Sequence, residues 1–211
     1  ILSYRQDTEG KNHALLLTTF IEEVLQEGGI RPEELKAIAI SMGPGSYTGL
    51  RIGVSTAKGM AYALNIPMIS VETLKIIAQG ILNTQHSWSE EPDFLICHMI
   101  DARRMEVYSA LYSSNNLKLI RKVQADIIDE YSYADFLKQT KILFCGDGAP
   151  KCKNIIHHTN AFFNEEYVIS AKDMVKIAYS KFVKDDFVDT AYFGPFYLKD
   201  FIATIPKKKI L

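Results

Sequence analysis

The chain has 211 residues, 47% of them apolar and 11% aromatic, which is enough for one sizeable core or for two small lobes that share an interface. Its 24 basic and 25 acidic side chains nearly cancel, which argues against a protein that grips nucleic acid unaided. Three cysteines without a C-x-x-C spacing argue against a disulfide framework or a zinc site, and no apolar run is long enough to cross a membrane. We therefore expect a cytoplasmic protein.

The first predicted element is a helix over residues 12–28. The chain begins at Ile1, in ILSYRQ, which has the character of a strand end, so we expect further residues upstream. The helix carries two adjacent apolar stripes: Leu16, Phe20 and Val24, and beside them Leu17, Ile21 and Leu25. Two stripes are wider than one core contact requires, so we expect this helix to pack on its own sheet and on a second surface. Complete burial in its own domain is the alternative.

Residues 37–82 alternate between strand and helix. The apolar run 37–42 is typical of a central parallel strand, and the loop SMGPGSYTGLRIG leads from it into a helix over 49–64. PMISV (67–71) then predicts a strand and ETLKIIAQGIL (72–82) a helix. This order favours an α/β layer with a mostly parallel sheet.

The polar stretch 83–93 predicts a boundary between an N-terminal α/β lobe, residues 1–88, and a C-terminal α/β lobe, residues 89–211. The second lobe opens with a three-stranded meander that turns at Asn115–Asn116. After the meander we expect a helix (133–139), a strand (KILFC, 141–145), the loop GDGAPK, a helix, a strand (EYVIS, 166–170) and a helix (171–183). Two such halves fit the actin-like, sugar-kinase-like fold, with its first hairpin missing from this chain.

The glycine loop consists of Gly43, Pro44, Gly45, Ser46 and Thr48. Its spacing, G-x-G-x-x-x-G, matches neither the dinucleotide fingerprint nor the P-loop, although amides at a helix start can still bind an anion. Ser46 or Thr48 as a nucleophile would need a base, and the histidines lie far away in the sequence. The third interpretation concerns close packing of the helix that follows.

Small residues recur every four positions along that helix, at Gly49, Gly53, Ala57 and Ala61. A face without side chains lets another backbone approach closely. We prefer a contact with another molecule, because the face with Ile52, Met60 and Leu64 can serve the sheet; packing of the small face on the chain's own sheet is the alternative. Arg51 opposes the helix dipole in the first turn, so it needs a partner carboxylate, a nearby nucleotide or simply water.

Four stretches together resemble the bacterial TsaB (YeaZ) family, which functions in tRNA threonylcarbamoyladenosine biosynthesis. The signature resembles SMGPGSYTGLRIGVSTAKGMAYALNIPMISVETL, residues 41–74. IDARRMEVY (100–108) resembles the family's D-A-R-x-x-E-V-Y, GDGAPK (146–151) its second glycine turn, and PFYLKDF (195–201) its P-x-Y-L-[KR]. The matches keep the family's order from His13 to the C-terminus, and the resemblance implies the actin-like fold with two similar lobes.

The resemblance also implies a role without catalysis. The related catalytic subunit TsaD carries V-N-H-x-x-A-H, whose two histidines bind a metal, and this chain has Thr73 and Ile77 at those positions. Those side chains do not hold that metal. We therefore expect no metal and no cofactor of the protein's own, with ATP or ADP only at the interface with a partner.

The expected partners are TsaD and the ATPase TsaE, with tRNA contacted only through the complex. In the family the first two helices, here 12–28 and 49–64, contact TsaD and also form a weaker homodimer contact. The predicted interface residues are Leu17, Phe20, Ile21, Val24, Gly49, Arg51, Gly53, Ala57, Met60 and Ala61. Gly53→Leu or Ala57→Leu is accordingly expected to fold normally and to weaken docking.

Two enzymatic alternatives remain open at this point. A metal- or nucleophile-dependent peptidase would need a metal site, or a nucleophile with a base. An actin-like-fold kinase would need the N-terminal phosphate loop, which this chain does not contain in its numbered residues.

Overall fold

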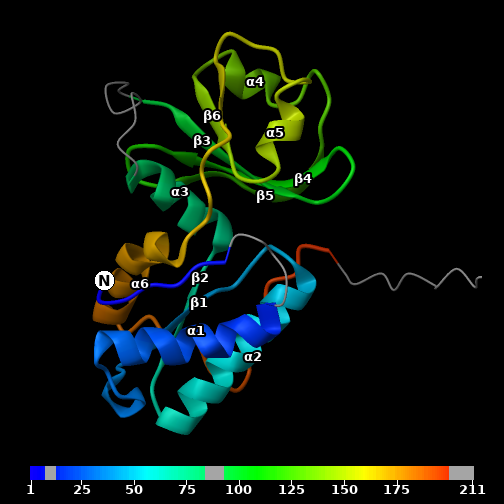
Figure 1. Ribbon diagram of the computed structural model, residues 1–211. Coiled ribbons are helices and arrows are strands. Elements are labelled where there is room, and N and C mark those ends of the chain that lie inside the picture. Colours follow the sequence, from blue (N-terminus) through cyan, green and yellow to red (C-terminus); the bar gives the residue numbers. More distant parts are fainter. Residues whose placement is uncertain (8–12, 84–92, 200–211) are drawn as a thin grey trace, which may run out of the picture.

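The computed structural model describes residues 1–7, 13–83 and 93–199, and it contains two separate sheets, the five-stranded one in the upper part of Figure 1 and the two-stranded one below it. β1 (Ile38–Ser41) and β2 (Met68–Val71) form a parallel pair. The second sheet has five strands in the order β5-β4-β3-β6-β7. Helix α3 (Thr73–Asn83) lies between the two sheets, so the predicted α/β class is confirmed.

The N-terminal part follows the predicted alternation of helices and strands. Its elements are α1 (His13–Gly28), η1 (Pro32–Glu34), β1, α2 (Tyr47–Leu64), β2 and α3. Helix α2 begins two residues earlier than predicted, because the Ser46 side chain caps it by accepting a hydrogen bond from the Gly49 N–H at 3.3 Å. Asn65, with φ 50°, ends it in the left-handed conformation.

Strand β1 differs from the central strand that its apolar run predicts. Within the described residues β1 pairs with β2 alone, and all four of its residues are only half-buried. Its run is apolar because both faces of the pair are covered: Ile38 and Ile40 contact the cluster that contains α2 residues, whereas Ala37 and Ala39 contact the cluster on the other side.

The five-stranded sheet opens with the predicted meander, which is confirmed. β3 (Leu95–Asp101), β4 (Glu106–Ser113) and β5 (Leu119–Ile127) are antiparallel, with Asn115 and Asn116 in the turn between the last two. β6 (Ile142–Cys145) and β7 (Ala161–Asn164) extend the sheet in parallel, and the short helices α4 (Ala134–Leu137) and α5 (Ala149–Cys152) complete this part.

The predicted strand over 166–170 is wrong, because the strand lies over residues 161–164. There Ala161–Asn164 pairs in register with β6. The Tyr167 side chain turns instead toward α3, where its hydroxyl donates to Asp173 Oδ2 at 2.7 Å and lies against the space left by Gly80. The long-range partner, not the local apolar content, decides which segment becomes the strand.

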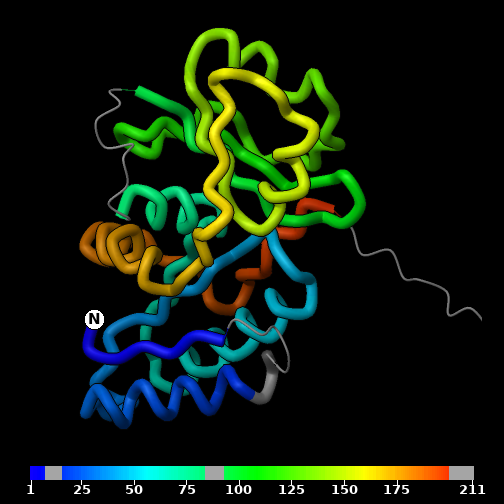
Figure 2. Tube along the Cα trace, turned by 45° about the horizontal axis from the view of Figure 1, so that its top comes forward, coloured from blue at the N-terminus to red at the C-terminus, as the bar shows by residue number. Residues whose placement is uncertain are grey.

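The C-terminal part returns to the first sheet. Helices η3 (Ala171–Met174) and α6 (Val175–Val183) confirm the last predicted helix, and α6 packs against β2 through Ala178 and Ile69. The division at residues 88 and 89 stays a prediction, and residues 84–92 of the expected boundary lie outside the described residues. Figure 2 shows the same return, with the late part of the chain alongside the N-terminal half.

Helix α3 joins the two sheets through apolar contacts. Leu74, Ile77 and Ala78 form one buried cluster with Ala110 and Tyr112 of β4. All three cysteines are buried and free of disulfides. None of the helices in the described ranges is long and apolar enough to cross a membrane.

Candidate functional site

Hydrogen bonds with Thr73, the first residue of α3, hold the glycine loop in place. The Thr73 hydroxyl lies 2.6 Å from Ser41 Oγ and accepts a hydrogen bond from the Gly43 N–H at 3.0 Å. The Gly43 carbonyl in turn accepts from the Thr73 N–H at 3.0 Å. Thr73 is buried, so these bonds fix the start of the loop to the start of α3 in a place without water to replace them.

The same loop is closed from the other side by residues 189–199, which we call the C-terminal strap. The Phe196 N–H donates to the Met42 carbonyl at 2.7 Å, and the Tyr197 ring stacks on Tyr47 with centroids 4.6 Å apart. Farther back, the Lys58 ammonium donates to the strap carbonyls of Ala191 and Phe193 at 2.9 and 3.0 Å. The strap therefore fastens the loop and α2 to each other.

Thr73 and Ile77 occupy the positions that the family resemblance assigns to metal ligands in TsaD. The Thr73 hydroxyl is engaged with the loop, and Ile77 is 3% exposed in the apolar cluster between α3 and β4. Thr73 thus ties the loop to α3, and Ile77 packs α3 against the five-stranded sheet. In the part of the chain that the structure describes, no group of three or more His, Cys, Asp or Glu side chains gathers to hold a metal ion.

Replacement of Thr73 by valine tests this holding role. Thr73→Val keeps the shape but leaves the Gly43 N–H without its acceptor and Ser41 Oγ without its partner. We expect a loss of about 1–3 kcal/mol in the free energy of unfolding, measured by urea titration. Thr73→Ser, which keeps the hydroxyl, should lose much less; a Thr73→Val chain as stable as the wild type would show that these hydrogen bonds contribute nothing to stability.

Helices α1 and α2 enclose an apolar groove together with the N-terminal segment. The groove has a volume of 360 Å³ and is lined by Arg5, Gln6, Asp7, Leu16, Leu17, Phe20, Ser46, Gly49, Ile52 and Gly53. The structure thus brings four predicted interface residues, Leu17, Phe20, Gly49 and Gly53, to one depression. Of the other residues predicted on the apolar stripes of α1, Ile21 and Val24 are half-buried.

The small-residue face of α2 packs mainly on the chain's own sheet. Ala57 and Ala61 are 5% and 2% exposed in a cluster with Met68, and a Cβ at Gly53 would lie 3.3 Å from Ile40 Cδ1. For Ala57 and Ala61 the preference for an intermolecular contact is wrong, because Met68 of β2 and Ile38 and Ile40 of β1 pack against them. Because Ala57 is buried in this cluster, we now expect Ala57→Leu to overpack the core and to destabilise the fold. Met60 is half-buried.

Arg51 lies at the exposed end of the loop, beside the aromatic stack. Its guanidinium carbon is 5.6 Å from the centre of the Tyr47 ring, a cation–π distance. Gly45 is half-buried, and the Ser46 and Thr48 side chains are exposed, with Ser46 in its capping role. The exposed Arg51 and the stacked pair of Tyr47 and Tyr197 thus lie together where the loop enters α2.

Three of the quoted motifs meet at the turn between β3 and β4. Asp101 accepts hydrogen bonds from the Lys151 ammonium and, at 2.8 Å, from the Arg103 N–H. The hydrogen bond from Lys151 lowers the pKa of Asp101. Glu106 pairs with Lys199 of the strap at 2.5 Å. Lys151 and Lys199 belong to two of the motifs that resemble the family, GDGAPK and PFYLKDF, but only the fold brings them to Asp101 and Glu106.

Cys145 and His98 form a buried contact that the sequence left unassigned. Cys145 Sγ lies 3.3 Å from His98 Nδ1, inside the five-stranded sheet. Burial lowers the pKa of His98 to about 3 and raises that of Cys145 well above its ordinary value. A nucleophilic cysteine needs the opposite shift, so this neutral pair serves the packing of the sheet.

Comparison with known proteins places this geometry in a family. Residues 7–206 match the family of tRNA N6-adenosine threonylcarbamoyltransferase, TsaD. The TsaB protein of Bacillus subtilis is 35% identical over 69% of this chain, and the matched region covers 61% of that relative's own length. The TsaB protein of Escherichia coli is 27% identical over 92% of this chain and 83% of its own length.

A further relative and the solved structures agree with these matches. The TsaB protein of Buchnera aphidicola subsp. Baizongia pistaciae is 32% identical over 75% of this chain and 73% of its own length. A Pseudomonas aeruginosa structure, described as similar to peptidase YEAZ, superposes with a TM-score of 0.72 at 24% identity, over 90% of this chain and 85% of its own, and so supports the fold. The chain therefore belongs to the TsaB (YeaZ) family, which is related to the tRNA N6-adenosine threonylcarbamoyltransferase TsaD.

Proposed function

We propose that this protein is a non-catalytic subunit required for threonylcarbamoylation of adenosine in tRNA, which docks on TsaD and activates it. Its relatives are named tRNA threonylcarbamoyladenosine biosynthesis proteins, which supports the pathway. The observation that carries the scaffold role is the apolar groove between α1 and α2, where four residues of the predicted interface meet. Thr73 and Ile77 support the absence of chemistry, because both side chains are used to hold the fold together.

The groove favours a helix from the partner as the docked element. Phe20 and Leu17 form an apolar wall on α1, and Gly49 and Gly53 leave the surface of α2 low beside it. A helix that inserts one apolar side chain into this depression would bury it without displacing any described side chain. A second copy of the chain would use the same surface, which makes the weaker homodimer an alternative to the complex with TsaD.

The remaining members of the proposed assembly act through this complex. TsaE would join it as the ATPase, and tRNA would be contacted through the complex as a whole. ATP or ADP, where this subunit meets it, would lie at the interface with a partner, near Arg51. We also propose that the two sheets are the two lobes of an actin-like fold and that the protein works in the cytoplasm.

Light scattering after size-exclusion chromatography tests the docking. Equimolar chain and TsaD from the same organism should elute together, with the mass of a heterodimer or of a dimer of heterodimers. The chain alone should show a smaller mass that rises with concentration if the homodimer forms. Separate elution of two folded proteins, at concentrations well above those in the cell, would rule out the scaffold role.

A further inference from the structure

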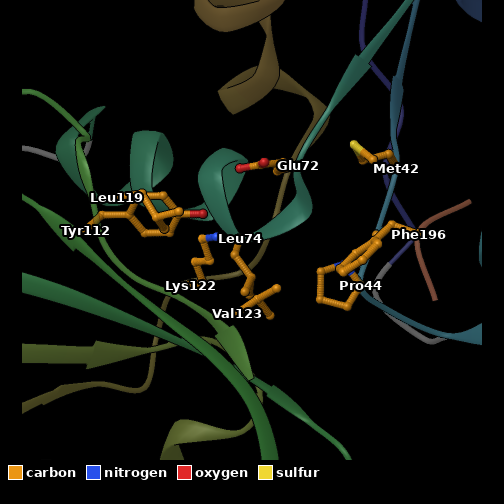
Figure 3. Close-up of a pocket in the computed structure, with 10 residues that line it drawn as sticks. Met42, Pro44, Glu72, Leu74, Tyr112, Leu119, Lys122, Val123 and Phe196 are labelled. Carbon is orange, nitrogen blue, oxygen red and sulfur yellow. The ribbon is translucent and has the colours of Figure 1, made fainter. Parts of the chain in front are cut away.

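A pocket lies between the glycine loop and the five-stranded sheet, and it shares no lining residue with the groove of α1 and α2. It has a volume of 380 Å³, within the range of sites that bind small molecules. Figure 3 shows its lining residues, which come from the loop, the start of α3, β4, β5 and the strap. The proposed function leaves this pocket unused.

Most of the residues that line the pocket are apolar, and Leu119 and Phe196 are its exposed apolar members. Leu74 and Pro44 are buried, and Val123 and Met42 are half-buried. Phe196 closes the side next to Pro44, and its backbone is fixed by the hydrogen bond to the Met42 carbonyl. A wall anchored in this way is formed before a ligand arrives, which lowers the entropic cost of binding.

The polar groups of the pocket gather on the side opposite Pro44 and Phe196. Figure 3 shows the ends of Glu72, Tyr112 and Lys122 there. Burial raises the pKa of Tyr112, and the neighbouring Glu72 carboxylate raises it further, so the phenol stays a hydrogen-bond donor. The Lys122 ammonium forms no ion pair with any described residue. Glu72 and Lys122 are both exposed, so this side offers one negative and one positive charge at the open edge of the pocket.

We propose that the pocket binds a small zwitterion with an apolar side group, of the kind represented by a free apolar α-amino acid. The ammonium group of such a ligand would meet Glu72 and its carboxylate would meet Lys122, while the side chain would lie between Pro44, Leu74 and Phe196. A ligand with only one charge would satisfy one of these residues and leave a like charge beside the other, at a cost in binding free energy.

A ligand in the pocket would also contact the C-terminal strap and so affect its mobility. Phe196 forms part of the pocket, and its neighbour Tyr197 stacks on Tyr47 at the start of α2. A ligand that packs against Phe196 would therefore reduce the motion of the strap, and hydrogen exchange at the Phe196 amide should slow by at least about threefold when the pocket is filled.

Three probes with the same phenyl ring test the charge requirement on the isolated chain. L-phenylalanine carries both charges, 3-phenylpropionate only the carboxylate, and 2-phenylethylamine only the ammonium. Titration up to about 10 mM, followed by amide chemical shifts of Gly43, Leu74 and Val123, should give a measurable Kd for L-phenylalanine, with both analogues weaker by about tenfold or more.

Matched variants separate this site from adventitious binding. Lys122→Met and Glu72→Gln should each weaken L-phenylalanine about tenfold or more, whereas Lys118→Met and Glu130→Gln, at exposed positions outside the pocket, should leave the Kd unchanged. Val123→Phe, which fills the cavity, should remove binding at an unchanged melting temperature. Equal binding of all three probes, or binding that survives Lys122→Met and Glu72→Gln, would overturn the proposal, as would no shift at any of the three amides. TsaD is absent from this test, so its result is independent of the proposed docking.

Discussion

Gly49→Leu is expected to weaken the complex with TsaD by about tenfold to 100-fold while leaving the chain folded. A Cβ at Gly49 meets Ser46 only at ordinary contact distances of 3.5 and 3.6 Å, so the helix accommodates the new side chain. The leucine then fills the groove between α1 and α2 that the partner would enter, and such overpacking costs about 1–3 kcal/mol. Isothermal titration of TsaD into wild type and variant measures the loss.

Gly59→Leu is the matched control on the same helix. Gly59 is exposed, and a Cβ there meets nothing within 4 Å. Both substitutions remove a helical glycine, so both should raise stability by up to about 1 kcal/mol, whereas only Gly49→Leu blocks the groove. Unchanged affinity of a folded Gly49→Leu chain would move the docking surface away from this groove; equal losses in both variants would point to the exposed face of α2 instead.

Gly43→Ala is expected to destabilise the protein by about 3 kcal/mol or more, which lowers the melting temperature by about 6–12 °C in a chain of this size. Gly43 has φ +113°, a region that side chains rarely adopt, and an added Cβ would lie 2.4 Å from the Phe196 carbonyl oxygen. The neighbouring backbone has to move, which breaks the hydrogen bond from Phe196 to the Met42 carbonyl. Differential scanning calorimetry gives the change in melting temperature.

Gly29→Ala separates the two causes of that loss. Gly29 also has a positive φ, +64°, but a Cβ there meets nothing within 4 Å. Only the backbone strain remains, and we expect a loss of about 1–2 kcal/mol. If Gly43→Ala loses no more than Gly29→Ala, the strap yields freely at the loop, and the fastening of loop to strap contributes little to stability.

Local patterns in the sequence predicted most elements but left one strand ambiguous. Periodic apolar residues predict α1 and α2, and alternation with a turn predicts the β3–β5 meander, because these patterns depend on neighbours within a few residues. The segments AFFN and EYVIS are both short and apolar enough for a strand. Only pairing with β6, which is about 20 residues away in the chain, selects the first.

The candidate site shows the same division between local and distant information. The glycine loop is visible in the sequence, yet its two fastenings, Thr73 and Phe196, lie far along the chain and are found only in the fold. The resemblance singled out Thr73 because TsaD has a metal-binding histidine at that position. The structure shows that Thr73 instead forms hydrogen bonds with the glycine loop.

By itself, the sequence determined the α/β class, the order of most elements, the family, and a helix with one face of small residues. The tertiary structure decided which part of the molecule lies against that face, because a face of small residues accepts any surface of matching shape. In this fold Met68 of β2 and Ile38 and Ile40 of β1 cover Ala57 and Ala61. The strap, the groove and the pocket likewise exist only after residues distant in sequence come together. Their geometry depends on long-range packing, which no local pattern encodes.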